Sequence, residues 1–420
     1  MFSQIERNIM KLELLSPAGN MEKLITALRF GANAVYFSGK SFGLRAFAGN
    51  FTNEEILQAV KLCHEKGAKA YITVNIVAHN SDFDGLEDYL KFLEKSKVDG
   101  VIVSDIGIMG LIKSVAPKLE LHVSTQANVT NKYAAKDYCD RGAKRIVLAR
   151  ELSLKEIKEI RDYIPQDVEL EAFVHGAMCI SYSGRCLLSN YLSGRNSNSG
   201  ACIQACRFGY TISEVSRHGE QLPIEEDERG TYILNSKDLC MIEYLDRLRD
   251  AGVTSFKVEG RMKSSYYVAT VTNAYARALK HLEECEKLGK KYVCPKELVL
   301  ELEKTSHRRY TTGFNFKETK KEEREYLETS QPVQTHEFVA IVLQDAICGK
   351  VLIEQRNRFK VGDTLEVLSP NDTFNKQIKV AKLTDTNGEE VLDAKNVQAK
   401  LYLHTRLKLK EGDILRIKVE

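Results

Sequence analysis

The chain alternates short apolar segments with amphipathic helical segments, and this alternation constrains the fold more than any other feature of the sequence. Near-continuous apolar runs rich in β-branched residues are typical of parallel strands that are buried on both faces. Eight such runs lie at residues 12–16, 34–38, 69–75, 100–105, 121–125, 145–149, 169–175 and 255–259. The sequence therefore predicts a parallel sheet of eight strands.

The intervening segments carry the signals of helices. Thr52 can cap the segment that begins with Asn53, Glu54 and Glu55, and several segments end in glycine before the next strand, as at Gly67. A doubly wound open sheet is one alternative for such a chain. The unbroken succession of eight strand–helix units favours closure into an α/β fold of the (β/α)8 TIM-barrel type.

The pattern changes after the barrel and predicts a second domain. We assign residues 1–290 to the barrel and residues 291–334 to a helical, charged linker. Residues 335–420 alternate apolar and polar residues between turn signals, which predicts a small C-terminal antiparallel β-barrel domain. This domain is similar to the β-barrels attached to translation and RNA-modification proteins, an analogy of fold only.

Composition and charge narrow the cellular setting. The 61 basic and 58 acidic residues nearly balance, which argues against broad binding to polyanions but leaves a local basic patch open. No apolar run is long enough to cross a membrane, and the first residues do not form a secretory signal. We therefore expect a cytosolic protein with no membrane partner.

One long connection interrupts the barrel and carries a cluster of cysteines. Residues 176–235 separate the seventh strand from its helix, whose first turn we expect to contain Cys240. The connection leaves from the barrel face where such folds place their active sites. Five of the ten cysteines lie in or beside it, and cytosolic thiols stay reduced, which favours metal or redox chemistry over disulfides.

Ligation by cysteines alone, with no nearby histidine pair, favours an iron–sulfur cluster. Zinc is an alternative, but it usually takes two short knuckles and only Cys202 and Cys206 are spaced in that way. A further alternative is that the cysteines are small buried apolar residues. We predict Cys179, Cys186, Cys202 and Cys240 as ligands, with Cys206 as the substitute for Cys202.

The residues around the first of these cysteines resemble a known signature. The U32 peptidase family shows the same pattern as Glu171-x-Phe173-x-His175-Gly176-Ala177-Met178-Cys179, followed by Gly184-Arg185-Cys186 and Ser189. The resemblance covers the whole barrel, and the C-terminal domain is similar to that of one bacterial branch.

The resemblance implies a specific chemistry, despite the family's name. Members of the family carry a 4Fe–4S cluster on four cysteines and support hydroxylation without oxygen. The branch most similar to this chain forms 5-hydroxyuridine at the wobble position of tRNA, with prephenate as the oxygen donor. Other branches act on ribosomal RNA or on quinone precursors. The implied partners are a tRNA anticodon loop, a small dicarboxylate co-substrate, and an electron-transfer or assembly protein.

Binding a dicarboxylate requires cations, and arginine matches carboxylates best. Our candidates for substrate binding are Arg45, Arg185 and Arg261, with Arg195 and Arg207 as further cations in the long connection. Amide side chains suit hydrogen bonding to a base or hydroxyl, and Asn75 and Gln126 follow barrel strands. Aromatic residues of the connection that could stack on a base are Tyr182, Tyr191, Phe208 and Tyr210.

His175, at the end of the seventh strand, is a candidate general acid or base, although backbone groups could equally satisfy it. Glu259, beside Arg261, is the second catalytic candidate. A peptidase with a structural metal and a non-catalytic assembly module are the alternative functions. No HExxH zinc motif is present, and the GxSxG match at residues 39–43 continues as a loop, so we interpret it as chance.

Overall fold

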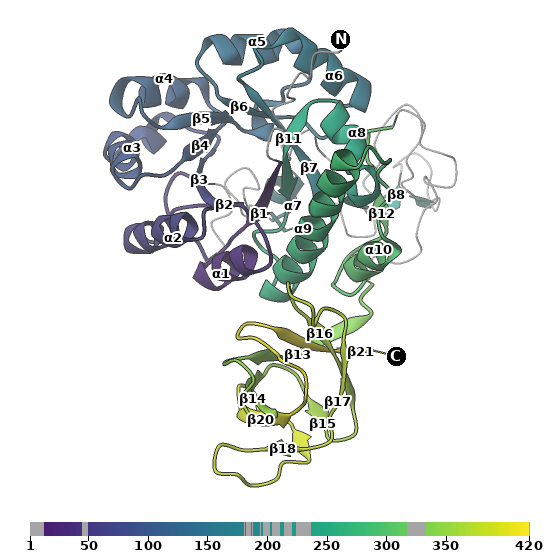
Figure 1. Ribbon diagram of the computed structural model, residues 1–420. Coiled ribbons are helices and arrows are strands. Elements are labelled where there is room, and N and C mark those ends of the chain that lie inside the picture. Colours follow the sequence, from purple (N-terminus) through teal and green to yellow (C-terminus); the bar gives the residue numbers. More distant parts are fainter. Residues whose placement is uncertain are drawn as a thin grey trace, which may run out of the picture.

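The computed structural model describes residues 12–43, 49–179, 237–316 and 333–419, together with short pieces between residues 181 and 223. Eight parallel strands form a closed barrel, because β11 pairs with β1 on one side and with β7 on the other (Figure 1). The strands are β1 (Glu13–Pro17), β2 (Ala34–Phe37), β3 (Lys69–Val74), β4 (Gly100–Val103), β5 (Glu120–Val123), β6 (Arg145–Val147), β7 (Glu169–Ala177) and β11 (Val253–Val258). The predicted (β/α)8 barrel is confirmed.

Helices cover the outside of the barrel. They are α1 (Met21–Arg29), α2 (Asn53–Glu65), α3 (Leu86–Lys95), α4 (Ile106–Val115), α5 (Lys132–Asp140), α6 (Leu154–Tyr163), α8 (Leu245–Asp250) and α9 (Ser265–Lys287). The N-terminal signal of α2 acts as expected, since Thr52 and Glu55 form a reciprocal capping box. Among the described residues, no helix is long and apolar enough to span a bilayer.

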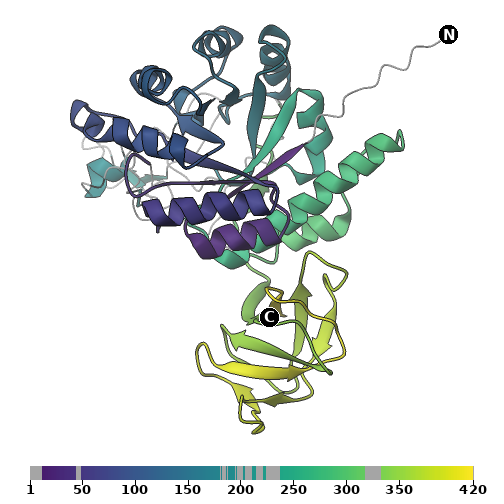
Figure 2. The same ribbon diagram turned by 60° about the vertical axis from the view of Figure 1, so that its left-hand side comes forward.

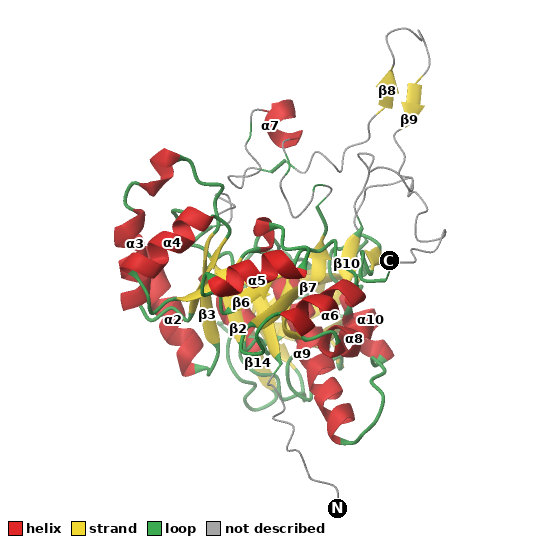
Figure 3. Cartoon of the chain, turned by 90° about the horizontal axis from the view of Figure 1, so that it is seen from above, coloured by secondary structure: helices red, strands yellow, loops and turns green. Residues whose placement is uncertain are grey.

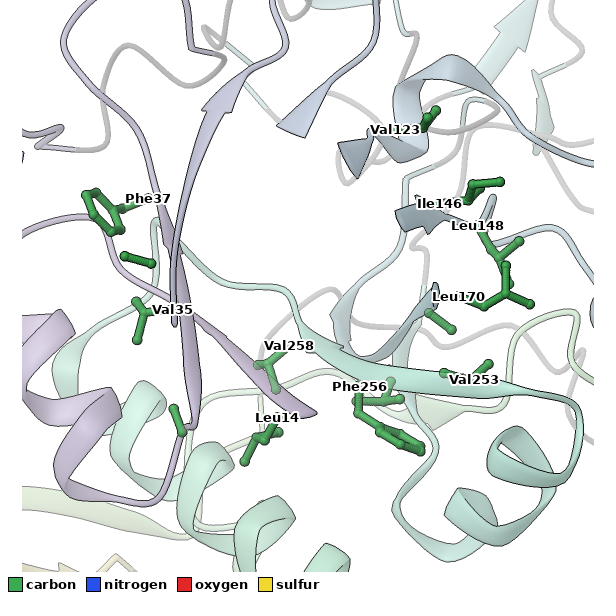
Figure 4. Close-up of a cluster of buried hydrophobic side chains, with 14 of the residues drawn as sticks. Leu14, Val35, Phe37, Val123, Ile146, Leu148, Leu170, Val253, Phe256 and Val258 are labelled. Carbon is green, nitrogen blue, oxygen red and sulfur yellow. The ribbon is translucent and has the colours of Figure 1, made fainter. Parts of the chain in front are cut away.

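The main hydrophobic core lies between the barrel strands and these helices. Leu14, Val35, Phe256 and Val258 project from the helix-facing side of their strands and are almost completely buried (Figure 4). Because side chains alternate along a strand, the residues between them point into the barrel. The lumen is therefore lined by a separate set of side chains, described below.

The long connection returns to the barrel as a strand. β10 (Asp238–Cys240) pairs antiparallel with the end of β7, which places Cys240 opposite His175, and β12 (Tyr310–Thr311) pairs with β10. The expectation that Cys240 begins a helix is wrong, because the helix α8 starts only at Leu245. The extra strand arises because β7 runs two residues beyond His175 and offers free backbone groups to pair with.

Further pieces of the connection lie beyond the C-terminal ends of the barrel strands. They are α7 (Leu188–Ser193) and the hairpin of β8 (Thr211–Ser213) and β9 (Gln221–Pro223) (Figure 3). After α9, the chain forms α10 (Lys296–Leu302) and β12 before residue 316. The charged stretch 317–332 of the predicted linker lies outside the described residues.

The C-terminal domain is an antiparallel β domain, as predicted. Its seven-stranded sheet has the order β17-β16-β21-β13-β14-β20-β18. The strands are β13 (His336–Val342), β14 (Lys350–Gln355), β16 (Thr364–Leu368), β17 (Gln377–Lys379), β18 (Leu383–Thr384), β20 (Lys400–His404) and β21 (Ile414–Lys418), with β15 (Phe359–Lys360) and β19 (Asp393–Ala394) forming a separate pair. The domain lies to one side of the barrel, against α1 and α9 (Figures 1 and 2).

Candidate active site at the barrel mouth

The mouth of the barrel, at the C-terminal ends of its strands, is crossed by a buried arginine. Arg261 follows β11, yet its guanidinium nitrogen Nη1 donates a hydrogen bond to Thr73 Oγ1 of β3 at 3.3 Å. The side chain is only 4% exposed. The strands β1 and β2 separate β11 from β3 in the sheet, so Arg261 extends over the lumen rather than along the wall.

The two predicted amide residues come together at this mouth. Asn75, just after β3, donates from Nδ2 to Ser124 Oγ at 3.5 Å, and the backbone N–H of Gln126 donates to the same oxygen at 3.3 Å. Because Thr73 lies two residues before Asn75 on the same strand, both face the lumen, and Arg261 reaches the side of the mouth where Asn75 and Ser124 lie. Arg261, Asn75 and Gln126 all lie at the C-terminal ends of barrel strands, and their roles in substrate binding stay predictions.

Beneath this line the lumen holds a network of buried charges. Lys257 Nζ donates to Glu171 Oε1 at 2.6 Å, and Arg145 Nη1 donates to the other carboxylate oxygen of Glu171 at 3.0 Å. Burial alone would raise the pKa of the Glu171 carboxyl, but the charges of Lys257 and Arg145 hold it below its ordinary value. Arg145 also bonds the carboxylates of Glu13 and Glu169.

Lys257 connects the network to the mouth. Its ammonium lies 4.4 Å from the centre of the Tyr36 ring and 5.4 Å from that of Phe173. Burial lowers the pKa of Lys257, with the nearby charges of Arg145 and Arg261 acting in the same direction. Sequence reasoning missed this network. Its signal was the charged residues at alternate positions inside otherwise apolar strands, such as Glu169 and Glu171.

His175 lies behind the barrel wall rather than in the lumen. A register shift between β7 and β11 pairs it with the outward-facing Val258. Its ring packs against those of Tyr267, Tyr275 and Tyr310, at centroid distances of 6.0, 5.4 and 5.3 Å. Burial lowers the pKa of His175 to about 3, and the charges of His307 and Lys263 act in the same direction. The imidazole is therefore neutral at physiological pH.

Glu259 lies next to His175 at the end of the neighbouring strand. Its backbone N–H donates to the carbonyl of His175 at 2.9 Å, and its own carbonyl accepts from the Tyr267 hydroxyl at 3.0 Å. Gly176 makes this close approach possible, because a Cβ there would lie 2.8 Å from the Glu259 carbonyl oxygen. The side chain of Glu259 is 6% exposed. The catalytic roles of His175 and Glu259 stay predictions.

Two of the predicted cysteine ligands lie where the long connection leaves and rejoins the barrel. Cys179 comes two residues after β7, and Cys240 ends β10, which pairs with β7. The Cys240 thiol is 3.7 Å from the Tyr275 hydroxyl, and burial raises its pKa to about 12. A buried thiol of this kind ionises only beside a positive charge, such as a metal ion.

The other two cysteines meet at the N-terminal end of α7. Cys186 Sγ accepts from the Leu188 backbone N–H at 3.4 Å. Ser189 Oγ donates to Cys202 Sγ at 3.7 Å and accepts from the Ile203 backbone N–H at 3.2 Å. Although 16 positions separate Cys186 and Cys202 in the sequence, one helical turn thus contacts both thiols.

Cys179 therefore follows β7 and Cys240 ends β10, while Cys186 and Cys202 both contact the first turn of α7. Within the part of the chain that the structure describes, no group of three or more histidine, cysteine or acidic side chains is close enough to hold a metal ion. The donor set itself, four thiols without histidine, suits an iron–sulfur cluster. Several residues singled out from the sequence lie outside the described residues: Arg45, Tyr182, Arg185, Cys206, Arg207, Phe208 and Tyr210.

The GxSxG match does not form a nucleophile elbow. Gly39 pairs with Phe51 in an isolated bridge, and α2 begins only at Asn53, ten residues beyond Gly43. An elbow requires the helix to follow the serine directly. The described residues around the match therefore show no elbow geometry, which agrees with its interpretation as chance.

The fold is a closed (β/α)8 barrel with a polar, cation-bearing mouth, and proteins of this class place their active sites at the C-terminal ends of the strands. Residues 19–325 match the model for Peptidase family U32, and residues 334–416 match that for the Peptidase family U32 C-terminal domain. The chain belongs to peptidase family U32.

Three relatives illustrate the similarity. The tRNA hydroxylation protein P1 of Bacillus subtilis is 41% identical over 387 residues, which cover 91% of this chain and 89% of that protein. The tRNA hydroxylation protein P of Escherichia coli is 35% identical over 404 residues, covering 87% and 88%. A 23S rRNA 5-hydroxycytidine synthase of Escherichia coli is 39% identical over 269 residues, covering 64% of this chain and 39% of that protein.

Proposed function

We propose that this chain is an RNA-modifying hydroxylase that converts the wobble uridine of tRNA to 5-hydroxyuridine without molecular oxygen. The observation that carries the proposal is its similarity, over 91% and 87% of the chain, to two proteins named for tRNA hydroxylation. The related 23S rRNA 5-hydroxycytidine synthase places ribosomal RNA second among the candidate substrates. The polar barrel mouth is the region where we expect the target base to bind.

The proposed cofactor is a 4Fe–4S cluster held by Cys179, Cys186, Cys202 and Cys240. The positions of Cys179 and Cys240 where the connection leaves and rejoins the barrel, and the shared contact of Cys186 and Cys202 with α7, support this choice. When bound, such a cluster supplies a redox-active metal centre. Its charge would also stabilise the thiolate of the buried Cys240.

The proposed oxygen donor is prephenate, a dicarboxylate. Arg261 is one described cation at the mouth, and Arg45 and Arg185 are further proposed carboxylate ligands. Arg261 is suited to this role because its guanidinium is held over the lumen by Thr73 and its planar fork can bind a carboxylate through two hydrogen bonds.

A uridine reaches such a pocket only when it is unstacked, and an anticodon loop presents its bases in that way. Asn75 and Gln126 are the proposed partners for the edge of the base, because Ser124 holds both at one point of the mouth. His175, in its neutral form, and Glu259 are the proposed acid and base residues. An electron-transfer or assembly partner is part of the same proposal.

The first test is anaerobic purification with quantification of iron and acid-labile sulfide, followed by nucleoside analysis of tRNA treated with the protein and prephenate. We expect about four irons and four sulfides per chain and the formation of 5-hydroxyuridine. Cys179→Ala should lose both the metal and the product. Cys348→Ala, at an exposed cysteine of the C-terminal domain, should keep both. A zinc-containing or metal-free wild type would contradict the proposal.

The family's description as a peptidase favours one second candidate, proteolysis with a structural metal. Cleavage of gelatin by the purified chain after removal of metal, with no hydroxylated nucleoside formed, would support it. Hydroxylation restored only by adding a partner protein would instead indicate an assembly module.

A further inference from the structure

The C-terminal domain carries a hollow of about 470 Å³ that the proposed chemistry does not use. It lies where β17 passes the C-terminal end of β20. Its lining includes Lys379, His404 and Arg406 and contains no carboxylate residue. In Figure 1 these strands belong to the part of the domain that extends away from the barrel, whereas β13, β16 and β21 lie nearer to it.

Among the described residues, the cations at and beside this hollow have no acidic partners. Lys379 and Arg406 are exposed, as are Lys350 and Lys382 beside the lining. Lys350 is in register with His404 across β14 and β20, and the Lys382 carbonyl accepts from the His404 N–H at 3.2 Å. None of these four cations forms an ion pair with a carboxylate among the described residues.

Several other cations of the same domain pair with acids. Arg356 pairs with Glu354 at 2.9 Å, Arg358 with Asp393 at 2.7 Å, and Lys410 with Asp345 at 2.7 Å. These pairs are the arrangement expected of an ordinary mixed surface. The hollow differs from these pairs, because its cations face solvent close together around a lining that includes no carboxylate residue. A chain with a net charge of only +3 can therefore present a locally positive site.

Two further groups, Tyr402 beside the hollow and His404 in its lining, suit a polyanion built of sugars and bases. Tyr402 presents its ring to Lys350, whose ammonium lies 4.7 Å from the ring centre. The Nε2 atom of His404 has no hydrogen-bond partner among the described residues. RNA-binding surfaces combine these features, namely cations for phosphates, an aromatic ring, and polar groups for the ribose.

The domain that bears the hollow is fixed to the barrel. The guanidinium of Arg416, on β21, makes two hydrogen bonds to Glu301 of α10, at 2.6 and 2.7 Å, with both side chains fully buried. Phe30 and Tyr266 of the barrel domain pack with Leu368 and Ile414 in one apolar cluster. A ligand at the hollow is therefore held at a set position relative to the barrel mouth.

We propose that this hollow binds the ribose–phosphate backbone of the RNA substrate, at a part of the RNA outside the loop that enters the barrel. The inference rests on the proposed function, since it takes the substrate to be RNA. The hollow adds affinity and selects RNAs long enough to reach both sites, while the mouth selects the base.

The test compares tRNA binding by anaerobically purified, full-length wild type and the Lys379→Glu/Arg406→Glu double variant. We expect the variant to bind about tenfold more weakly or worse near 0.1 M salt, and the slope of log affinity against log salt to fall by about two. The matched control is Lys61→Glu/Lys97→Glu, which makes the same charge change at a hollow of about 450 Å³ on the barrel, where Glu65 is also present. The control should bind like the wild type.

Equal affinity of wild type and Lys379→Glu/Arg406→Glu, or an equal loss in both double variants, would overturn the inference. Hydroxylation separates it from the proposed function. An anticodon stem–loop, too short to reach both sites, should be modified at the same rate by wild type and variant, whereas KM for whole tRNA should rise in the variant. Binding that depends on the hollow without any hydroxylation would overturn the proposed function alone.

Discussion

Charged side chains occupy positions inside this barrel that branched apolar residues fill in most folds of its type. Glu171 is fully buried and shares its carboxylate between Lys257 and Arg145. Burying such charges is costly unless each is paired, so removing one partner is far more damaging than removing an exposed ion pair. The network therefore holds Lys257 below the mouth, and it does so only as long as Glu171 supplies its negative charge.

Replacing Glu171 by glutamine should lower the free energy of unfolding by about 3–5 kcal/mol, because it leaves the buried Lys257 and Arg145 without that charge. The matched control is Glu169→Gln on the same strand, whose side chain is 39% exposed although it also bonds Arg145. We expect a loss of about 1 kcal/mol or less there. Urea unfolding followed by circular dichroism measures both, since the chain has no tryptophan. Equal losses would contradict the assigned role of burial.

The sequence allowed the polar residues that follow strands to be predicted as site residues, but not the polar residues that lie within strands. Asn75, Gln126 and Arg261 are recognisable because each ends an apolar run, and the structure joins them at one mouth. The pairing of Glu171 with Lys257 joins strands 86 positions apart in the chain, and no local pattern encodes such a contact. His175 was predicted from the same rule, but a register shift turns it outward.

At the scale of elements, the junction of β7, β10 and β11 connects the barrel to its cysteine-bearing segment. The eight barrel strands were predictable from their apolar runs, whereas β10 was not, because three residues carry no periodic signal. The short strands β15, β18 and β19 could not be predicted from the sequence for the same reason. β10 forms because the extended end of β7 provides a strand to pair with. This long-range contact outweighs the intrinsic conformational preference of the three residues.

Gly176 is the residue on which this junction depends. It has φ of +111°, and a Cβ would collide with the Glu259 carbonyl at 2.8 Å. Gly176→Ala should destabilise the protein by about 1–3 kcal/mol and lower its iron content by displacing β10 and Cys240. Gly85→Ala is the control, with φ of +77° but no atom within 4 Å of the added Cβ. It should cost about 1 kcal/mol and keep its iron. Full iron in Gly176→Ala would disprove the link.

At the scale of the whole molecule, the two domains behave as one unit because buried charges join them. Arg416 bonds Glu301 of α10 as well as Glu366 and Asn375 of its own domain, all within 2.8 Å. Arg29 of α1 adds a second link to Asp413 at 2.8 Å, where the tight turn at Gly412 brings β21 against the barrel. The sequence predicted both domains but not this interface, since its partners look like ordinary surface charges.

Arg416→Met should therefore uncouple the domains. The substitution leaves the buried carboxylate of Glu301 without its two strongest hydrogen bonds, at an expected cost of about 3–5 kcal/mol. Calorimetry of the wild type should show one transition, and the variant should show two, with the C-terminal domain and the barrel unfolding separately.

Arg358→Met is the control for loss of an arginine, because its pair with Asp393 is exposed and lies within one domain. It should cost about 1 kcal/mol or less and keep a single transition. If the RNA-binding hollow acts from a fixed position, Arg416→Met should also raise KM for whole tRNA while leaving the anticodon stem–loop unaffected. A variant with two transitions and an unchanged KM would contradict this expectation. It would show that RNA binding by the hollow does not depend on the rigid interface between the domains.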